Sequence, residues 1–357
     1  MTTTTHLKRL VLLGAGQAHL HVLTTLARGG LEGVEITLVA PFSRQLHSEM
    51  VPGFVAGHYT LEDCVIPLEP LLRNGAIRWL RHSAVAIDAD ARTITLEDGS
   101  VHGFDWLSVN TGLVQNRNQI EQTISGARKH GLFVRPTESF GALWPQVVEL
   151  ALSRALRLAV LGGGATGIEL AMAIRQRLPG ASVTLLTGDV ETTANDPSQV
   201  QQQVARALKR HNITVLVDRA VGITATEVML ASGARLACDV PLIVTGMQAP
   251  VWLESSGLAL DAGGCIAADV FQRSTSHPHV FAAGDASSRV ALAKNLVAAV
   301  TGAPLVPHQP PKNTLNILSC GDRRAIASWG RFSADGRWVW WFKDWIDRRF
   351  IQRYRKD

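Results

Sequence analysis

The sequence has few cysteines, and none of them are paired at the spacings that metal or disulfide chemistry uses. Its four cysteines are far apart and form neither a CxxC nor a CxxxxC pair: Cys64, Cys238, Cys265 and Cys320. This spacing argues against a zinc knuckle and against a redox-active disulfide between near neighbours, and we predict no metal site. A buried, free cysteine is the better interpretation of each one.

Long apolar runs are missing as well. No run reaches the ~18 residues that a membrane-spanning helix needs, and residues 1–9 lack the apolar core of a signal peptide. We therefore expect a cytoplasmic protein. Hydrophobic residues make up 46% of the chain and charged residues 18%, which is ordinary for a globular α/β protein of two or three domains.

Excess charge is confined to one end of the chain. The formal net charge is +5, and residues 337–357 alone hold seven Lys or Arg and three Asp, a net +4. The remainder is nearly neutral, which argues against a nucleic-acid-binding surface.

A glycine turn near the N-terminus is the first positive signal. The apolar residues 10–13 indicate a buried parallel strand, and Gly14-Ala15-Gly16 then turns the chain into a helix that we expect to reach Arg28. Free backbone N–H groups at such a turn form an anion site suited to the pyrophosphate of a dinucleotide. Because His19 replaces the usual third glycine, the turn by itself fits an ordinary strand-turn-helix equally well.

The chain repeats this device. Residues 158–161 predict a second buried strand, Gly162, Gly164 and Gly167 fill all three glycine positions, and another helix follows. Two such units are hard to obtain by chance. They predict two dinucleotide-binding domains that face each other.

The elements after each turn are duplicated too. A strand follows each helix, at residues 34–40 and 182–186, and each unit closes with an Asp-to-Thr-Gly run, at 105–112 and 239–246. The acidic residue that normally holds the adenosine ribose after the second strand is missing from both units. The sequence therefore shows no preference between NADH and NADPH.

Other segments have local signatures. Thr60 followed by Asp63 predicts a capped helix that extends to Arg73, and residues 76–104 predict a small antiparallel meander. Residues 274–285 end in Gly-Asp, which fits either a strand that aims the Asp285 carboxylate at a sugar or polyol hydroxyl or a simple turn.

Taken in order, these motifs resemble the pyridine nucleotide-disulfide oxidoreductase superfamily, whose members are flavoproteins with two dinucleotide domains. Without a CxxxxC pair, the chain is more similar to type II NADH:quinone oxidoreductases than to disulfide reductases. Three runs, at residues 14–20, 50–59 and 341–350, resemble most the flavoprotein module that occurs alone or fused to selenide water dikinase.

The resemblance implies an α/β fold with two Rossmann-like domains and a C-terminal amphipathic segment. The FAD domain would be discontinuous, at residues 1–115 and 249–300, with the NAD(P) domain inserted at 116–248 and a C-terminal region at 301–357. The implied activity is hydride transfer from NADH or NADPH to FAD and on to a small, quinone-like acceptor.

The resemblance also implies site residues. For FAD these are Gly14, Gly16, the amides of Gln17, Ala18 and His19, and Thr111, Gly112, Gly284 and Asp285. For NAD(P)H they are Gly162, Gly164, Thr166, Gly167 and Gly246. Glu169, one turn inside the second helix, is the candidate catalytic residue that orients the nicotinamide or the acceptor; the alternative is a solvated helix residue.

One departure from the family pattern follows Asp285. The chain passes almost directly into the helical run 290–300, so the helix expected to point at the flavin is shortened or displaced. The alternative function is therefore a catalytically degenerate nucleotide-binding or redox-sensing protein with weak or no FAD binding.

The tail at residues 337–357 predicts an amphipathic helix. Its apolar stripe consists of Val339, Phe342, Ile346, Phe350 and Tyr354, widened by Trp338, Trp341 and Trp345, with Lys343 and several arginines opposite. Tryptophan combined with basic residues is typical of interfacial helices. We therefore predict a peripheral contact with the inner face of the membrane, like that of type II quinone reductases. The alternatives are docking on the protein's own core or on a second subunit of a homo-oligomer.

Overall fold

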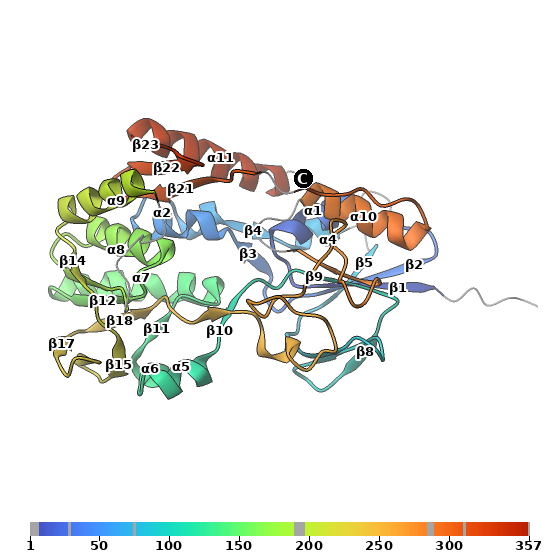
Figure 1. The fold of residues 1–357 in the computed structure, drawn as a ribbon, viewed down its shortest axis with the longest axis horizontal. Helices are drawn as coiled ribbons and strands as arrows, with labels where there is room; N and C mark the ends of the chain where they lie inside the picture. The colour runs from blue at the N-terminus through green and yellow to red at the C-terminus, as the bar shows by residue number, and fades with distance from the viewer. Residues whose placement is uncertain are drawn as a thin grey trace, which may run out of the picture.

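Two five-stranded parallel sheets form the body of the protein (Figure 1). The structure, a computed structural model, describes residues 7–27, 30–73, 76–188, 197–283, 289–309 and 312–355. The first sheet has the order β20 (Val280–Ala282), β9 (Trp106–Val109), β1 (Lys8–Leu13), β2 (Val34–Val39) and β5 (Ile77–Leu80). The second has the order β11 (Leu132–Phe133), β18 (Val240–Ile243), β12 (Arg157–Leu161), β13 (Ser182–Leu186) and β14 (Thr214–Leu216).

The two units have the same plan, which confirms the predicted fold class. Each adds a three-stranded antiparallel sheet, formed by β6 (Ala84–Asp88), β7 (Thr93–Leu96) and β8 (Val101–Gly103) in the first unit and by β15 (Ala220–Ile223), β16 (Glu227–Leu230) and β17 (Arg235–Ala237) in the second. The connecting segments pair as β10 (Val114–Gln115) and β19 (Met247–Gln248). Because β20 returns to the first sheet from beyond the second, the first unit is discontinuous; the exact domain limits stay predictions.

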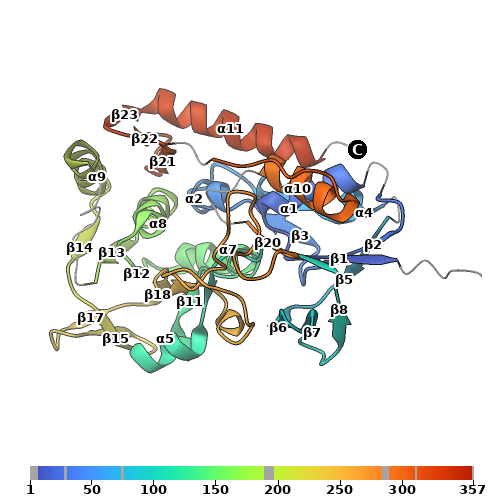
Figure 2. The same ribbon diagram turned by 45° about the vertical axis from the view of Figure 1, so that its right-hand side comes forward.

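Helices cover the sheets and one helix bridges them. Figure 2 shows α1 (Gln17–Leu26) and α10 (Arg289–Thr301) above the first sheet, and α8 (Ala165–Arg177) and α9 (Ser198–Arg210) above the second, with α11 (Arg337–Arg355) running over both. Further helices are η1 (Ser48–Met50), α2 (Val51–Val55), α5 (Arg117–Thr123), α6 (Ala127–His130), α7 (Thr137–Ser153) and η2 (Val251–Leu253). None of the helices in these described ranges combines the length and apolar character that a bilayer crossing requires.

Two local predictions were partly wrong. The Thr60 capping box forms, but its helix α3 (Leu61–Cys64) ends at once, and β4 (Val65–Pro67) pairs with β3 (Arg44–Leu46) before α4 (Glu69–Leu72) begins. Pro67 explains this, because a proline disfavours helical geometry in the residue before it. Residues 77–80 join the parallel sheet beside β2 instead of the meander.

The C-terminal region was only half predicted. It contains an antiparallel sheet that the sequence patterns did not indicate, formed by β21 (Leu315–Ser319), β22 (Ala325–Trp329) and β23 (Phe332–Gly336). The predicted helix α11 follows, and one of its faces docks on the protein's own core, with Val339, Ile351 and Tyr354 buried. Lys343 lies on this buried face, so its predicted place on the solvent side was wrong. The opposite face leaves Trp338, Trp341, Phe342 and Trp345 between 43% and 60% exposed.

Candidate active site

The first glycine turn is built around Asn110, which directly follows β9. Gly14 has φ +89°, and a Cβ there would lie 2.4 Å from the Asn110 carbonyl oxygen. A Cβ at Gly16 would lie 2.3 Å from Asn110 Oδ1. The Gly16 N–H donates to the same carbonyl oxygen at 3.2 Å. Glycine is required at both positions because Asn110 passes so close.

Asn110 also joins three segments that the sequence assigned to FAD. Its Oδ1 accepts the N–H groups of Ala18 (3.2 Å) and His19 (3.3 Å) at the start of α1. Its Nδ2 donates to the Ala283 carbonyl at 3.0 Å, just before Gly284 and Asp285, which lie outside the described residues. Thr111 and Gly112 follow it directly, so the structure brings these segments together.

This arrangement changes one site prediction. The amides of Ala18 and His19 were predicted to bind the pyrophosphate, but both are engaged by Asn110. Among the described residues, the amides of Ala15 and Gln17 have no hydrogen-bond acceptor, so these two are the donors that the turn can offer to an anion.

His19 takes the structural place of the third glycine. Its ring is fully buried, with Nδ1 2.6 Å from the Gly14 carbonyl and Nε2 2.8 Å from Ser108 Oγ. A carbonyl can only accept, so Nδ1 carries the hydrogen and Nε2 accepts from the Ser108 hydroxyl. Burial lowers the pKa of His19 to about 4, so the ring is neutral at pH 7. Two hydrogen bonds here replace the close helix-strand contact of a glycine.

The second turn is more open. A Cβ at Gly167 would lie 1.8 Å from the Gly162 carbonyl, so this glycine provides the close packing of α8 on its strand. A Cβ at Gly164 would meet nothing within 4 Å. Gly164 is the N-cap residue of α8, and it has no side chain that could accept the first N–H groups of the helix. Thr166 is exposed beside it, whereas Gly246 (φ +75°) faces Ile120 of α5. The uncovered N–H groups of this turn fit a pyrophosphate.

Glu169 of α8 contacts the C-terminal region of the chain. Its carboxylate accepts the Ser319 N–H at 2.7 Å. Burial raises the pKa of Glu169 to about 7, opposed by the Lys343 ammonium and the Ser319 hydrogen bond. The side chain is half-buried, and a share of the carboxyl group is protonated at neutral pH.

A polar network runs from Lys343, whose charge acts on Glu169, to the side chain of Gln17 at the first turn. Lys343 Nζ donates to the Glu49 carbonyl (2.7 Å) and to Asp347 (2.6 Å). The other Asp347 oxygen lies 3.5 Å from His47 Nε2, and His47 Nδ1 is 3.4 Å from Gln17 Nε2. Burial alone would raise the pKa of Asp347, but the His47 and Lys343 contacts outweigh it and lower that pKa.

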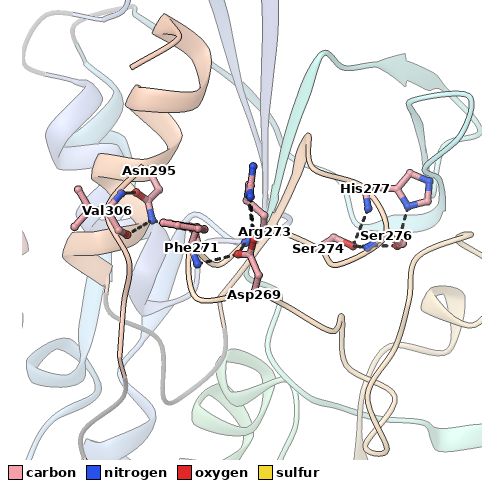
Figure 3. A network of polar contacts seen from close by, with 8 residues as sticks. All are labelled: Asp269, Phe271, Arg273, Ser274, Ser276, His277, Asn295 and Val306. Carbon is pink, nitrogen blue, oxygen red and sulfur yellow. Dashed lines mark hydrogen bonds and ion pairs between the residues drawn. The ribbon is translucent and has the colours of Figure 1, made fainter. Parts of the chain in front are cut away.

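A second polar network holds the segment that precedes β20 (Figure 3). Asp269 accepts the N–H groups of Phe271 and Arg273 and pairs with the Arg273 guanidinium at 3.1 Å. Asn295 of α10, fully buried, donates to the carbonyls of Phe271 and Val306. Asn295 therefore ties the segment at Phe271 to α10, and the next residue, Gln272, accepts the Ala282 N–H of β20 at 3.0 Å.

Glu169 provides a stability test in which pH is the variable. Between its ordinary pKa of 4.5 and its folded pKa of about 7, the folded state holds a proton that the unfolded chain has lost. Stability contributed by this group is therefore lost as pH rises through that window. We expect Glu169→Gln, which can still accept from Ser319, to unfold less readily than wild type at pH 8 by roughly 2 kcal/mol.

Urea unfolding at pH 5 and pH 8 measures this effect. The exposed Glu149→Gln on α7 is the control and should match wild type at both pH values. Equal pH dependence of wild type and Glu169→Gln would show that the carboxyl group titrates normally.

Comparisons with known proteins agree with this architecture. The family model described as pyridine nucleotide-disulphide oxidoreductase matches residues 8–300. The ferredoxin–NAD(+) reductase component of the p-cumate 2,3-dioxygenase system of Pseudomonas putida is 29% identical over 299 residues, 79% of this chain and 68% of that protein. Type II NADH:quinone oxidoreductase of Staphylococcus aureus is 26% identical over 178 residues, 48% of this chain and 44% of that protein.

A solved structure shares the fold over nearly the whole chain. The sulfide:quinone oxidoreductase of Aquifex aeolicus matches with a TM-score of 0.78 at 17% identity, covering 98% of this chain and 91% of that chain.

Proposed function

This chain belongs to the pyridine nucleotide-disulphide oxidoreductase family, whose members are NAD(P)H-dependent flavoprotein oxidoreductases, and from this premise we propose that it passes electrons to a quinone-like acceptor. The family uses FAD together with NADH or NADPH. The Staphylococcus relative is a quinone reductase by name, while the Pseudomonas relative acts with a ferredoxin, so the acceptor is the point that experiment must decide.

The two turns supply the cofactor sites of this proposal. FAD would lie on the first turn, against the amides of Ala15 and Gln17 and beside Thr111-Gly112, with Asp285 assigned from the sequence. NAD(P)H would lie on the second turn, above Gly164, where a side chain would meet open space. Bound FAD supplies the group that accepts hydride from the nicotinamide. The chain's own task is to hold the two cofactors in line and exclude water.

Glu169 is the proposed catalytic residue. It lies one turn beyond Gly164 on α8, and its pKa of about 7 allows it to hold or release a proton at neutral pH. A quinone takes up protons on reduction, so a carboxyl group poised near neutrality suits either orientation of the nicotinamide or proton delivery to the acceptor.

The exposed aromatic face of α11 is the observation that carries the quinone proposal. Trp338, Trp341, Phe342 and Trp345 lie on the outer side of the helix whose inner side holds Lys343 beside Glu169. Exposed indoles flanked by arginines suit the headgroup region of an anionic membrane, where apolar quinones dissolve.

Purified protein tests the proposal directly. Flavin absorption that bleaches on adding NADH or NADPH without oxygen, and that recovers on adding a short-chain quinone, is the expected result. Recovery of the flavin absorption with ferredoxin but not with quinone would show that the acceptor is a ferredoxin. Colourless protein that takes up no added FAD and oxidises neither nucleotide would overturn the function and leave the degenerate nucleotide-binding alternative.

Membrane contact has its own test. We expect Trp341→Ser with Trp345→Ser to weaken binding to anionic vesicles roughly tenfold or more, because each exposed indole contributes about 1 kcal/mol at the interface. Soluble quinone should still be reduced. Removing all of α11 is a poor test, because its inner face belongs to the core.

The control for this measurement is Leu152→Ser, which changes an 85% exposed leucine on α7. Vesicle cosedimentation at low and high salt should show unchanged binding for the control. Equal binding by the tryptophan variant and wild type would show that α11 is not the membrane contact.

Cys64 provides a negative prediction. It is buried, and burial raises the pKa of its thiol to about 12, so it is not a thiolate at neutral pH. Cys320 has the same character. Cys64→Ser is therefore expected to keep its rate of NAD(P)H oxidation per bound flavin within about twofold. A strong loss in a folded variant would show a thiol mechanism.

A further inference from the structure

The inner face of α11 contains a buried ion pair. Lys343 and Asp347, one turn apart, are 6% and 4% exposed and lie 2.6 Å from each other. Burying two charges costs desolvation that their attraction does not reliably recover, and apolar residues of similar shape are often at least as stable. Stability alone does not account for this pair, so its contacts with other residues are informative.

The pair leads to the first turn. Asp347 faces His47 Nε2 (3.5 Å), and His47 Nδ1 is hydrogen-bonded to the side-chain amide of Gln17 (3.4 Å). With the hydrogen on Nε2, the ring points a donor at the carboxylate and an acceptor at the amide. Gln17 is the first residue of α1, and its backbone N–H is one of the two amides left for an anion at that turn.

A second contact fixes the ring in this orientation. Phe350 of α11 stacks on His47 with ring centroids 4.5 Å apart, and the Arg289 guanidinium at the start of α10 lies over the Phe350 ring, 4.7 Å from its centre. The second turn has no such attachment, because Ala165 occupies the position that corresponds to Gln17. Within the described residues, the contacts through His47 link the first turn, and not the second, to the C-terminal helix.

We propose that Lys343, Asp347 and His47 are positioning residues that hold Gln17 in place, so that docking of α11 completes the FAD site. This inference rests on the proposed placement of FAD at the first turn. It assigns α11 two separate tasks, one for each face: the outer face meets the membrane, and the inner face retains the cofactor.

The test replaces the ion pair with apolar residues. The double variant Lys343→Met/Asp347→Leu should stay folded with a thermal stability close to that of wild type, because the removed desolvation cost of two charges offsets the partners that the Glu49 carbonyl and His47 lose. It should nevertheless bind FAD roughly tenfold more weakly, the effect of losing one hydrogen bond to a charged group. FAD release from the full-length holoprotein on dilution, followed by flavin fluorescence, measures this affinity separately from turnover.

A double-mutant cycle tests whether the ion pair affects FAD affinity through Gln17. Gln17→Met alone should weaken FAD binding to a similar extent, and combining it with the ion-pair variant should add little. Additive effects would overturn the inference.

The control is Asp344→Asn on the same helix. Asp344 accepts from Tyr59 (2.6 Å) and pairs with Arg348, without reaching Gln17. It should cost stability and leave FAD affinity unchanged. If wild type retains no FAD, the proposed function fails. If wild type and the apolar variant retain FAD equally, only this inference fails.

Discussion

Replacing Gly164 with valine is expected to lower kcat/KM for reduction of the flavin by NADH or NADPH by about 100-fold or more. FAD itself should stay bound. The backbone at Gly164 (φ −72°, ψ 175°) is extended and accepts valine, and a Cβ there meets nothing within 4 Å. The fold should therefore be unaffected. The branched side chain would fill the space in front of the turn, where the pyrophosphate must approach the N–H groups.

Anaerobic bleaching of the flavin measures this loss, and Gly167→Ala is the matched comparison. Its Cβ would lie 1.8 Å from the Gly162 carbonyl, so this smaller substitution should damage the fold of the second unit. If Gly164→Val loses FAD and keeps its response to NAD(P)H, the two cofactor sites are assigned in reverse.

His19→Gly, which restores the common glycine fingerprint, is expected to destabilise the protein by about 3 kcal/mol or more. The substitution leaves a cavity where the buried ring was. It also removes the partners of the Gly14 carbonyl and the Ser108 hydroxyl. A second result concerns pH. Because the pKa of His19 falls from 6.5 to about 4 on folding, the unfolded chain binds the proton first, and stability is lost as pH falls from about 6.5 to about 4.

Denaturant unfolding at pH 7 and pH 5 measures both effects. His19→Gly should be less stable than wild type at pH 7, with a smaller difference at pH 5. The exposed Thr25→Ala on the same helix is the control and should be close to wild type. A His19→Gly protein as stable as wild type would contradict this prediction. It would show that β1 and α1 pack against the glycine with no loss in the free energy of unfolding.

The repeated glycine turns made most of the fold predictable. The repetition of these turns located both units. The strand at Ser182–Leu186 was predicted to the residue because turn residues bound it on both sides. The sheet at β21 to β23 was not predicted, because its strands carry little alternation of polar and apolar residues, and β22 ends and β23 begins at an exposed aromatic residue, Trp329 and Phe332.

The residues that join the two units were harder to predict. Asn110 was missed, although aligning the two Thr-Gly runs places it opposite Val244, a polar residue where the copy is apolar. Lys343 was placed outward by its charge, yet it stands four residues after the buried Val339 and four before Asp347. Helical spacing puts all three on one face, and only the folded chain shows that the two charges neutralise each other there.

The order of strands in the first sheet has a consequence for synthesis on the ribosome. Every strand of the second sheet lies between residues 132 and 243, whereas β9 receives its neighbour β20 only at residues 280–282. A nascent chain can therefore complete the inserted unit while the N-terminal one still has an open strand edge. Such edges are the surfaces that invite wrong pairing. The N-terminal unit is synthesised first but completes its sheet last. Chaperones therefore have more time to bind this unit than the inserted one.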